Sequence, residues 1–332
     1  MRLLIVFAAA ILFVSCNSSN TPDVSNIKVN ITTERYEKKL FDTTAASLTE
    51  YLQKLNSGFT TLYIDTILGL DHRWRADTLA PIMNNVIRAY RDIYNESEKK
   101  YSDFTPYENE IKKGLQFTKY YFPDYKLPEK ITTFIGPADG VATAVASNTI
   151  LIGLQNYLGK DFPLYKTAEV QTIYPEYISR RFEPEYISIN CMKSIIEDMY
   201  PDRSDDFTLV NKMIEKGKRL YILSKLLPAK KEYQLIGYTE KQLEASYKDE
   251  DKIWDLFVRN SLLQQTDLLA TKSYIDEGPK TQELGEGSPG NIGSFCGWQI
   301  VKKYMQQKKD ISLSQLMSTD DETIFQEAKY KP

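Results

Sequence analysis

Cysteine and histidine are scarce in this sequence, which limits the metal sites and nucleophilic active sites that the chain can form. The 332 residues include three cysteines and one histidine, His72. A zinc site of the two-histidine type is excluded with a single histidine. No G-x-S-x-G turn is present to expose a serine nucleophile. We therefore predict no catalytic residue, metal ligand or cofactor site, and we interpret His72 as a surface or capping side chain.

Glycines gather near the C-terminus, in the segment SPGNIGSFCGWQIVKKYM at 288–305. Residues 285–290 match the G-x-G-x-x-G pattern of dinucleotide-binding loops. That pattern binds phosphate only when a strand precedes it, and residues 274–280 are rich in turn formers instead. We therefore predict a helix over 289–307, with Ser288 as its N-cap and Pro289 as its first residue.

Gly293 and Gly297 lie four residues apart, so they share one face of this predicted helix, beside Cys296. Glycine inside a helix costs about 1 kcal/mol relative to alanine. Two such glycines predict close contact with another backbone. We expect the neighbour to be the helix over 184–200, which carries Cys191. Buried free thiols are favoured for Cys191 and Cys296, and a disulfide is the alternative.

The first residues, MRLLIVFAAAILFVSCNSSN, have the organisation of a signal peptide. The apolar run from Leu3 to Val14 follows Arg2 and is too short for an ordinary membrane-spanning helix. The run is followed by Ser15 and Cys16, and this junction resembles a bacterial lipobox. The resemblance implies cleavage before Cys16 and acylation of its thiol. A conventional signal peptide with an incidental cysteine is the alternative. Acyl chains would anchor the protein to a bilayer, facing the periplasm.

Composition and charge indicate an ordinary globular protein. The chain is 42% hydrophobic and 26% charged, with a net charge of −3 and no basic block, so nucleic acid is excluded as a partner. We expect a signal peptide at 1–15, the lipidated cysteine with a flexible tether at 16–26, and a single domain at 27–332.

The elements that must position these residues follow from periodicity. Strands are expected at 27–37, 131–136, 141–147 and 149–154, with a hairpin turn at Asp139-Gly140. Helical spacing is found at 44–56, 78–101, 106–121, 168–181, 184–200, 207–227, 239–260, 289–307 and 319–328. Capping boxes are predicted at Thr239 and Thr319. The fold class is therefore α+β, with a small, mostly antiparallel sheet in the first half packed on a predominantly helical second half.

Several segments in this order resemble the gliding-motility lipoprotein GldB family of Bacteroidetes. They are 150–165, 175–187, 213–228, 236–244, 253–263 and 288–305, together with ITTERYE at 31–37. The resemblance covers nearly the whole mature chain. It implies a lipoprotein of the cell envelope, required for motility in gliding bacteria, and it implies no particular biochemical activity.

The chain also resembles, more faintly, the HExxH zinc peptidases. The resemblance lies in the order of elements: a short sheet, then helices, and a final helix with a G-x-x-x-G pattern. The metal-binding helix of that family should follow the strand at 149–154. Neither 168–181 nor 184–200 contains a histidine, and EKGK at 215–218 places lysines near the expected metal. The resemblance therefore implies a degenerate, peptidase-like scaffold without its metal.

The favoured hypothesis is a non-catalytic lipoprotein, bound to the membrane by its lipid, that binds other envelope proteins. The first alternative is an envelope hydrolase for peptide or glycan, with a site in the cleft between the sheet and the helical half. The second is a glycan-binding lipoprotein that uses exposed members of its 23 tyrosines. Arg180-Arg181 could bind an anion, although a surface pair is the simpler interpretation.

Overall fold

The computed structural model describes residues 21–53, 58–204 and 206–332. Its four strands form one sheet with the order β1 (Thr32–Arg35), β2 (Lys130–Phe134), β4 (Thr149–Gly153) and β3 (Thr143–Ala146). The remaining elements are helices, and the described buried hydrophobic side chains from Val24 to Tyr330 form one core. The predicted α+β class is confirmed.

The sheet is mixed, so the prediction that it is mostly antiparallel was wrong. Strand β2 is parallel to both β1 and β4, and only β3 and β4 are antiparallel. The turn at 137–140 closes with Gly140 N–H donating to the Pro137 carbonyl, but the chain then passes β4 and forms β3 at the sheet edge. The hairpin lies instead at 147–148, where Ser147 has a φ of 54°.

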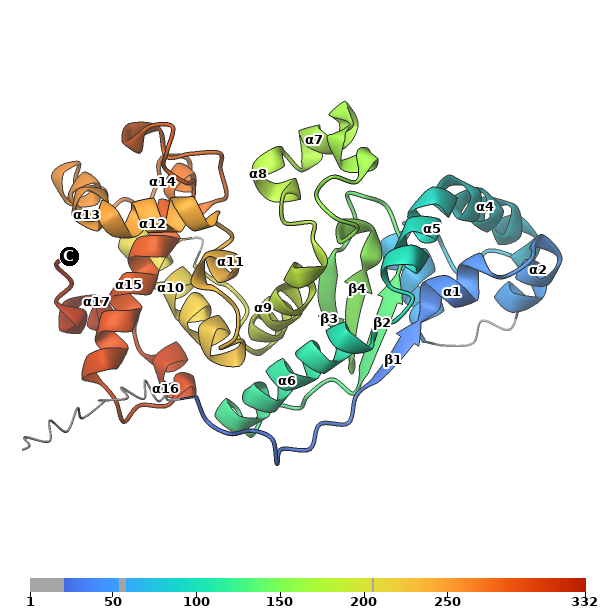
Figure 1. Ribbon diagram of the computed structural model, residues 1–332, viewed down its shortest axis with the longest axis horizontal. Helices are drawn as coiled ribbons and strands as arrows, with labels where there is room; N and C mark the ends of the chain where they lie inside the picture. Colours follow the sequence, from blue (N-terminus) through green and yellow to red (C-terminus); the bar gives the residue numbers. More distant parts are fainter. Residues whose placement is uncertain (1–20, 54–57, 205) are drawn as a thin grey trace, which may run out of the picture.

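The helices of the first half lie between β1 and β2 in the sequence. They are α1 (Tyr36–Phe41), α2 (Ala45–Gln53), α3 (Phe59–Leu62), the π-helix η1 (Tyr63–Ile67), α4 (Ala76–Ala89), α5 (Arg91–Lys100) and α6 (Thr105–Tyr121). The predicted helix at 78–101 is divided into α4 and α5 because Tyr90 leaves the helical region, with φ −100° and ψ 11°. Figure 1 shows α1, α2, α4 and α5 on the β1 side of the sheet.

The second half is almost entirely helical. It comprises η2 (Leu154–Asn156), η3 (Pro163–Lys166), α7 (Ala168–Ile173), α8 (Glu176–Ser179), η4 (Pro184–Tyr186), α9 (Ile187–Met199), α10 (Leu209–Leu226), α11 (Glu232–Ile236), α12 (Glu240–Lys248), α13 (Glu250–Arg259), α14 (Leu268–Ile275), η5 (Gln282–Leu284), α15 (Ile292–Gln307), α16 (Leu313–Ser318) and α17 (Asp321–Ala328). Helix α9 packs against β3, and the later helices continue outward from it (Figure 1).

Helix α15 packs against α10, which corrects the expectation that its neighbour would be the helix with Cys191. A Cβ atom on Gly297 would overlap the carbonyl group of Met213 in α10. A Cβ atom on Gly293 would lie 2.8 Å from the carbonyl oxygen of Tyr274 in α14. Both glycines therefore lie where neighbouring backbones come too close for a side chain.

The start of α15 also differs from the prediction. The helix begins at Ile292 with Asn291 as its N-cap, in a left-handed conformation with φ 56°. Ser288 is not the cap, because its hydroxyl group joins two loop segments by donating to the carbonyl of Thr281 and accepting from the Thr281 N–H. Thr239 does form the expected capping box, whereas α17 is capped by Asp320 and not by Thr319.

The two cysteines in the described part of the chain are buried and have free thiols, so the disulfide alternative is excluded for this pair. Burial raises the pKa of both thiols, Cys191 on α9 and Cys296 on α15. Cys16 lies outside the described residues. Within the described residues, no helix combines the length and the apolar character needed to cross a bilayer.

Candidate functional site: a charged cavity between two helices and a loop

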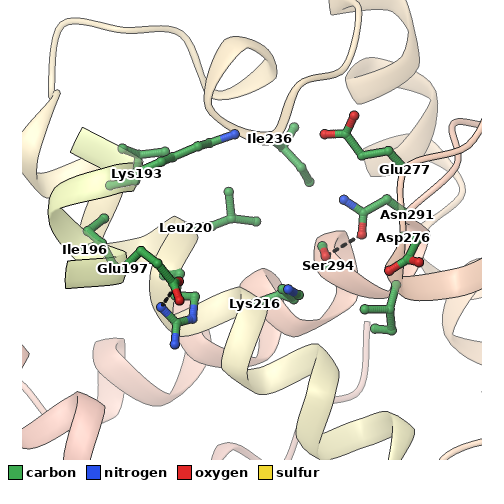
Figure 2. Close-up of a pocket in the computed structure, with 13 residues that line it drawn as sticks. Lys193, Ile196, Glu197, Lys216, Leu220, Ile236, Asp276, Glu277, Asn291 and Ser294 are labelled. Atoms are coloured by element: carbon green, nitrogen blue, oxygen red, sulfur yellow. Dashed lines mark hydrogen bonds and ion pairs between the residues drawn. The ribbon is translucent and has the colours of Figure 1, made fainter. Parts of the chain in front are cut away.

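A cavity of about 350 Å³ lies between α9, α10 and the segment that links α14 to α15. Its apolar lining is supplied by Ile196, Leu220, Leu223, Ile236 and Ile275. Figure 2 shows Lys193 on one side of this space and Glu277, Asp276 and Asn291 on the other. The cavity thus combines an apolar surface with charged groups on facing walls.

Two charged residues of α9 reach the cavity, Lys193 and Glu197. They are four residues apart, so the 3.6-residue repeat of the helix places them on one face. Helix α10 supplies Lys216 and Arg219 in the same way. The crossing of α10 with α15 brings Asn291 and Ser294, at the N-terminus of α15, to the opposite wall.

Most of the charged groups of the cavity are held in ion pairs. Arg219 lies 3.2 Å from the Glu197 carboxylate and 3.7 Å from that of Glu215. Lys216 Nζ lies 2.8 Å from an oxygen of Asp202. The pKa of Asp202 lies well below its usual range although the residue is partly buried, because Lys216 and Ser204 both donate to its ionised form.

Glu277 forms a two-pronged ion pair with Arg181. Arg181 Nη1 donates to Glu277 Oε1 at 2.7 Å, and Nη2 contacts the second oxygen. Burial alone would raise the pKa of Glu277, but the pair with Arg181 outweighs it and lowers that pKa. The guanidinium group packs against Gly237, whose φ of +84° and lack of a side chain leave it room.

Arg180 lies behind this pair and completes a cationic cluster. Its Nη2 donates to the Gly237 carbonyl at 2.9 Å and to Gln242 Oε1 at 3.2 Å. Burial, followed by the charge of Arg181, lowers the pKa of Arg180. The interpretation of Arg180-Arg181 as a plain surface pair was therefore wrong, because the only side-chain acceptor of Arg181 in the described residues is a cavity carboxylate.

Lys193 differs from the other cations. Its ammonium group makes no ion pair or hydrogen bond with any residue in the described ranges, 21–53, 58–204 and 206–332. Burial, followed by the nearby positive charge of Arg181, lowers its pKa to about 8, and Glu277 only partly opposes this change. The cavity therefore contains one cation whose charge no neighbouring acceptor compensates.

The residues singled out in the sequence lie around this cavity or away from it. Gly293, Gly297, Cys191 and Cys296 are buried in the helices that form its walls, but they do not line it. His72 lies on the surface, where its Nδ1 is 2.6 Å from Asp65. With Asp71 these groups form a cluster of possible metal ligands, but hydrogen bonds between η1 and the turn that follows it already account for the arrangement.

The comparison with protein families decides what the chain is related to. The sequence model of the family described as gliding motility protein GldB matches residues 17–332. The chain belongs to the GldB family. The resemblance read from the sequence is thereby confirmed over nearly the whole chain. Searches of curated proteins and of solved structures found no match, and the likeness to zinc peptidases stays a prediction.

The cavity of this GldB family member could not be found from motifs. Lys193 lies among buried apolar residues of α9, namely Met192, Ile195 and Ile196. A lysine at such a position is the one local signal, since long charged side chains are seldom buried without a partner. The other wall, at 275–294, is distant in the sequence and carries no pattern that would place it opposite α9.

Proposed function

We propose that this chain is a lipid-anchored, non-catalytic lipoprotein of the cell envelope that binds other envelope proteins, in gliding-motility or related machinery. The observation that carries the proposal is the match to the GldB family over residues 17–332, which begins directly after Cys16. Residues 1–15 would be removed as a signal peptide. Cys16 would carry the lipid, 17–26 would serve as the tether, and 27–332 would form one periplasm-facing domain.

The charge arrangement of the cavity supports binding more than catalysis. On α9, which follows the sheet strand β4, the turn facing the cavity presents Lys193 and Glu197, and the Glu197 carboxylate is paired with Arg219. If the scaffold is peptidase-like, these residues stand on the helix where metal ligands would be expected. The raised pKa values of Cys191 and Cys296 disfavour the thiolate, which is the reactive form of cysteine.

The hydrolase alternative would draw on Asp276 and Glu277, two carboxylates on the apolar-walled cavity. A glycosidase or an acid–base peptidase needs one carboxyl group whose pKa is raised, so that it can donate a proton. The pKa of Glu277 is lowered instead, because Arg181 stabilises its ionised form. Binding of a ligand or partner is therefore the better supported of the two.

The glycan-binding alternative needs exposed, coplanar aromatic rings. Tyr120 is half exposed, and its ring stands edge-on to Tyr121, with an interplanar angle of 87°. The stacked pair of Phe41 and Tyr94 is buried. Tyr247, the other exposed tyrosine in the described residues, packs edge-on against Phe295. These arrangements favour protein packing over sugar stacking.

The proposal can be tested by affinity capture of the tagged full chain from gently cross-linked, solubilised envelopes. The matched control is a reporter protein that carries only residues 1–26, so that partners of the lipid anchor are subtracted. We expect identified motility or secretion components of the envelope to be enriched by the full chain alone. An eluate identical to that of the control would contradict the proposal.

A further inference from the structure

We propose that the cavity between α9, α10 and the 275–294 segment binds a carboxylate that carries an apolar substituent, with Lys193 as its counter-ion. This goes beyond the proposed function, because it depends neither on the lipid anchor nor on the identity of an envelope partner. The class of ligand follows from three features of the cavity: an uncompensated cation, a second donor on the facing wall, and an apolar surface between them.

The first feature is the unbalanced charge around Lys193. Arg181 and Arg180 approach from the residues that follow α8, and Glu277 is already held by both prongs of Arg181. Lys216 and Arg219 have their own carboxylate partners. A partly buried ammonium group without a partner is costly, and an anion entering the cavity would relieve that cost.

The second feature is Asn291 at the N-terminus of α15. Ser294 Oγ donates to Asn291 Oδ1, which fixes the side-chain amide with its nitrogen on the other side. Figure 2 shows that nitrogen facing the cavity, and it has no acceptor within the described residues. The amide could donate to a second oxygen of the ligand, and the positive end of the helix dipole adds to the attraction for an anion.

The third feature selects the kind of anion. Leu220 forms the apolar surface between Lys193 and Asn291 in Figure 2, and Leu223 and Ile236 extend it. A volume of about 350 Å³ is at the small end of ligand-binding cavities. The Asp276 carboxylate on the same wall disfavours an anion with more than one negative charge, such as phosphate. A monovalent carboxylate with a Leu-sized apolar group fits this combination.

Such a carboxylate has two sources, a free small acid or the C-terminus of a polypeptide. Binding to the full chain would be measured by calorimetry with N-acetyl-leucine, with its uncharged primary amide, and with inorganic phosphate. A pentapeptide that ends in leucine would be compared with the same peptide amidated at its C-terminus. We expect N-acetyl-leucine to bind at least tenfold more tightly than its amide, and phosphate not to displace it.

Binding of the peptide with a free C-terminus would identify a chain end as the source, whereas exclusion of the peptide would identify a small acid. Lys193→Met keeps the apolar stem of lysine and removes its charge, and it should weaken binding of N-acetyl-leucine at least tenfold. Lys193→Arg should retain most of the affinity. Lys241→Met, an exposed lysine on α12, is the matched control and should bind normally.

Four results would overturn the proposal, and three of them concern the relative affinities. They are equal binding of the acid and the amide, unchanged affinity in Lys193→Met, and displacement by phosphate at a comparable concentration. Absence of binding by every carboxylate probe would also overturn it. The comparison of acid with amide uses the unaltered protein, so the test stands even if Lys193→Met fails to fold.

Discussion

Gly217 of α10 and Gly297 of α15 touch where the two helices cross. A Cβ atom on Gly217 would overlap the carbonyl group of Gly297. A Cβ atom on Gly297 would in turn overlap the carbonyl group of Met213. The two helices therefore pack backbone against backbone, and this contact sets the separation between the α10 wall of the cavity and the N-terminus of α15.

Replacing Gly297 by alanine should destabilise the protein. The added methyl group has no free space, because its nearest neighbours are backbone atoms that cannot rotate away. Overpacking of this kind costs about 1–3 kcal/mol, and we expect the upper part of that range. The free energy of unfolding, measured by urea denaturation, is the appropriate readout.

Gly287→Ala is the matched control for that substitution. Gly287 belongs to the same glycine-rich segment, but it is exposed and a Cβ atom there would meet no heavy atom within 4 Å. Its free energy of unfolding should change by less than about 0.5 kcal/mol. Equal effects of the two substitutions would show that the α10–α15 contact is not the origin of the destabilisation.

Lys218 should be essential to stability for an electrostatic reason. It is 3% exposed at its side chain, lies 2.7 Å from Asp321 Oδ1, and also pairs with Glu215. Lys218→Met would leave the Asp321 carboxylate without its counter-charge and would leave Glu215 with Arg219 alone. Breaking a buried ion pair in this way typically costs about 3–5 kcal/mol. The prediction is checked by urea denaturation at pH 7, with Lys241→Met as an exposed control.

The same cluster predicts a pH dependence of the unfolding free energy. Burial, reinforced by Glu215, outweighs Lys218 and raises the pKa of Asp321 from 3.8 to about 6. The folded state then binds the proton more tightly than the unfolded state, so this residue contributes stability that increases as pH falls from about 6 to 4. Asp321→Asn should remove that contribution, and an unchanged pH profile in the variant would contradict it.

Helix positions in this protein follow from local periodicity, whereas its strand order does not. The predicted helices at 106–121 and 207–227 correspond closely to α6 and α10. After β2 the chain skips the neighbouring position in the sheet, forms β3 at the edge, and returns as β4 to pair with β2. No residue in the turn at 137–140 predicts this strand order. The predicted helix at 168–181 is interrupted because Pro175 has no N–H to continue it.

The candidate site was less predictable than the fold. Gly293 and Gly297 indicate a helix in tight contact with another backbone, but they do not identify the partner helix. That helix is α10, where a Cβ atom on Gly217 would overlap the Gly297 carbonyl. The role proposed for Lys193 depends on the absence of a partner for its ammonium group among the described residues. That property belongs to the tertiary structure, because a lysine in an amphipathic helix is ordinarily solvated or paired.

The thiols of Cys191 and Cys296 should be inert in the folded protein. Both are fully buried, and burial raises their pKa, so neither is accessible nor ionised. We expect no N-ethylmaleimide adduct on either residue by mass spectrometry under native conditions, and complete labelling in guanidinium chloride. Rapid native labelling of either thiol would mean that α9 or α15 opens readily.

Cys16 should behave differently from these two cysteines. If it carries the lipid, Cys16→Ala should move the protein from the membrane fraction to the soluble fraction after cell lysis and centrifugation. Ser15→Thr, which retains the cysteine and changes its neighbour conservatively, provides a control for the fractionation. A Cys16→Ala protein that still sediments with membranes would contradict the anchor.

The proposed carboxylate site should lose affinity as pH rises through about 8. Lysine has an ordinary pKa of 10.5, but burial and the neighbouring cations lower that of Lys193 to about 8. The ammonium form is the counter-ion of the ligand, so affinity is full below this pH and should fall by up to about tenfold per pH unit above it. Calorimetry with N-acetyl-leucine between pH 6 and 10 measures this.

Lys193→Arg and Lys193→Met separate this titration from others in the cavity. The other charged groups that face it are Arg181, Glu197, Lys216, Arg219, Asp276 and Glu277, and they are present in all three proteins. Arginine stays charged in this range, so Lys193→Arg should retain binding at pH 9, and the weak binding of Lys193→Met should not vary with pH. A loss of affinity at pH 9 in Lys193→Arg equal to that of the unaltered protein would assign the titration to a different group.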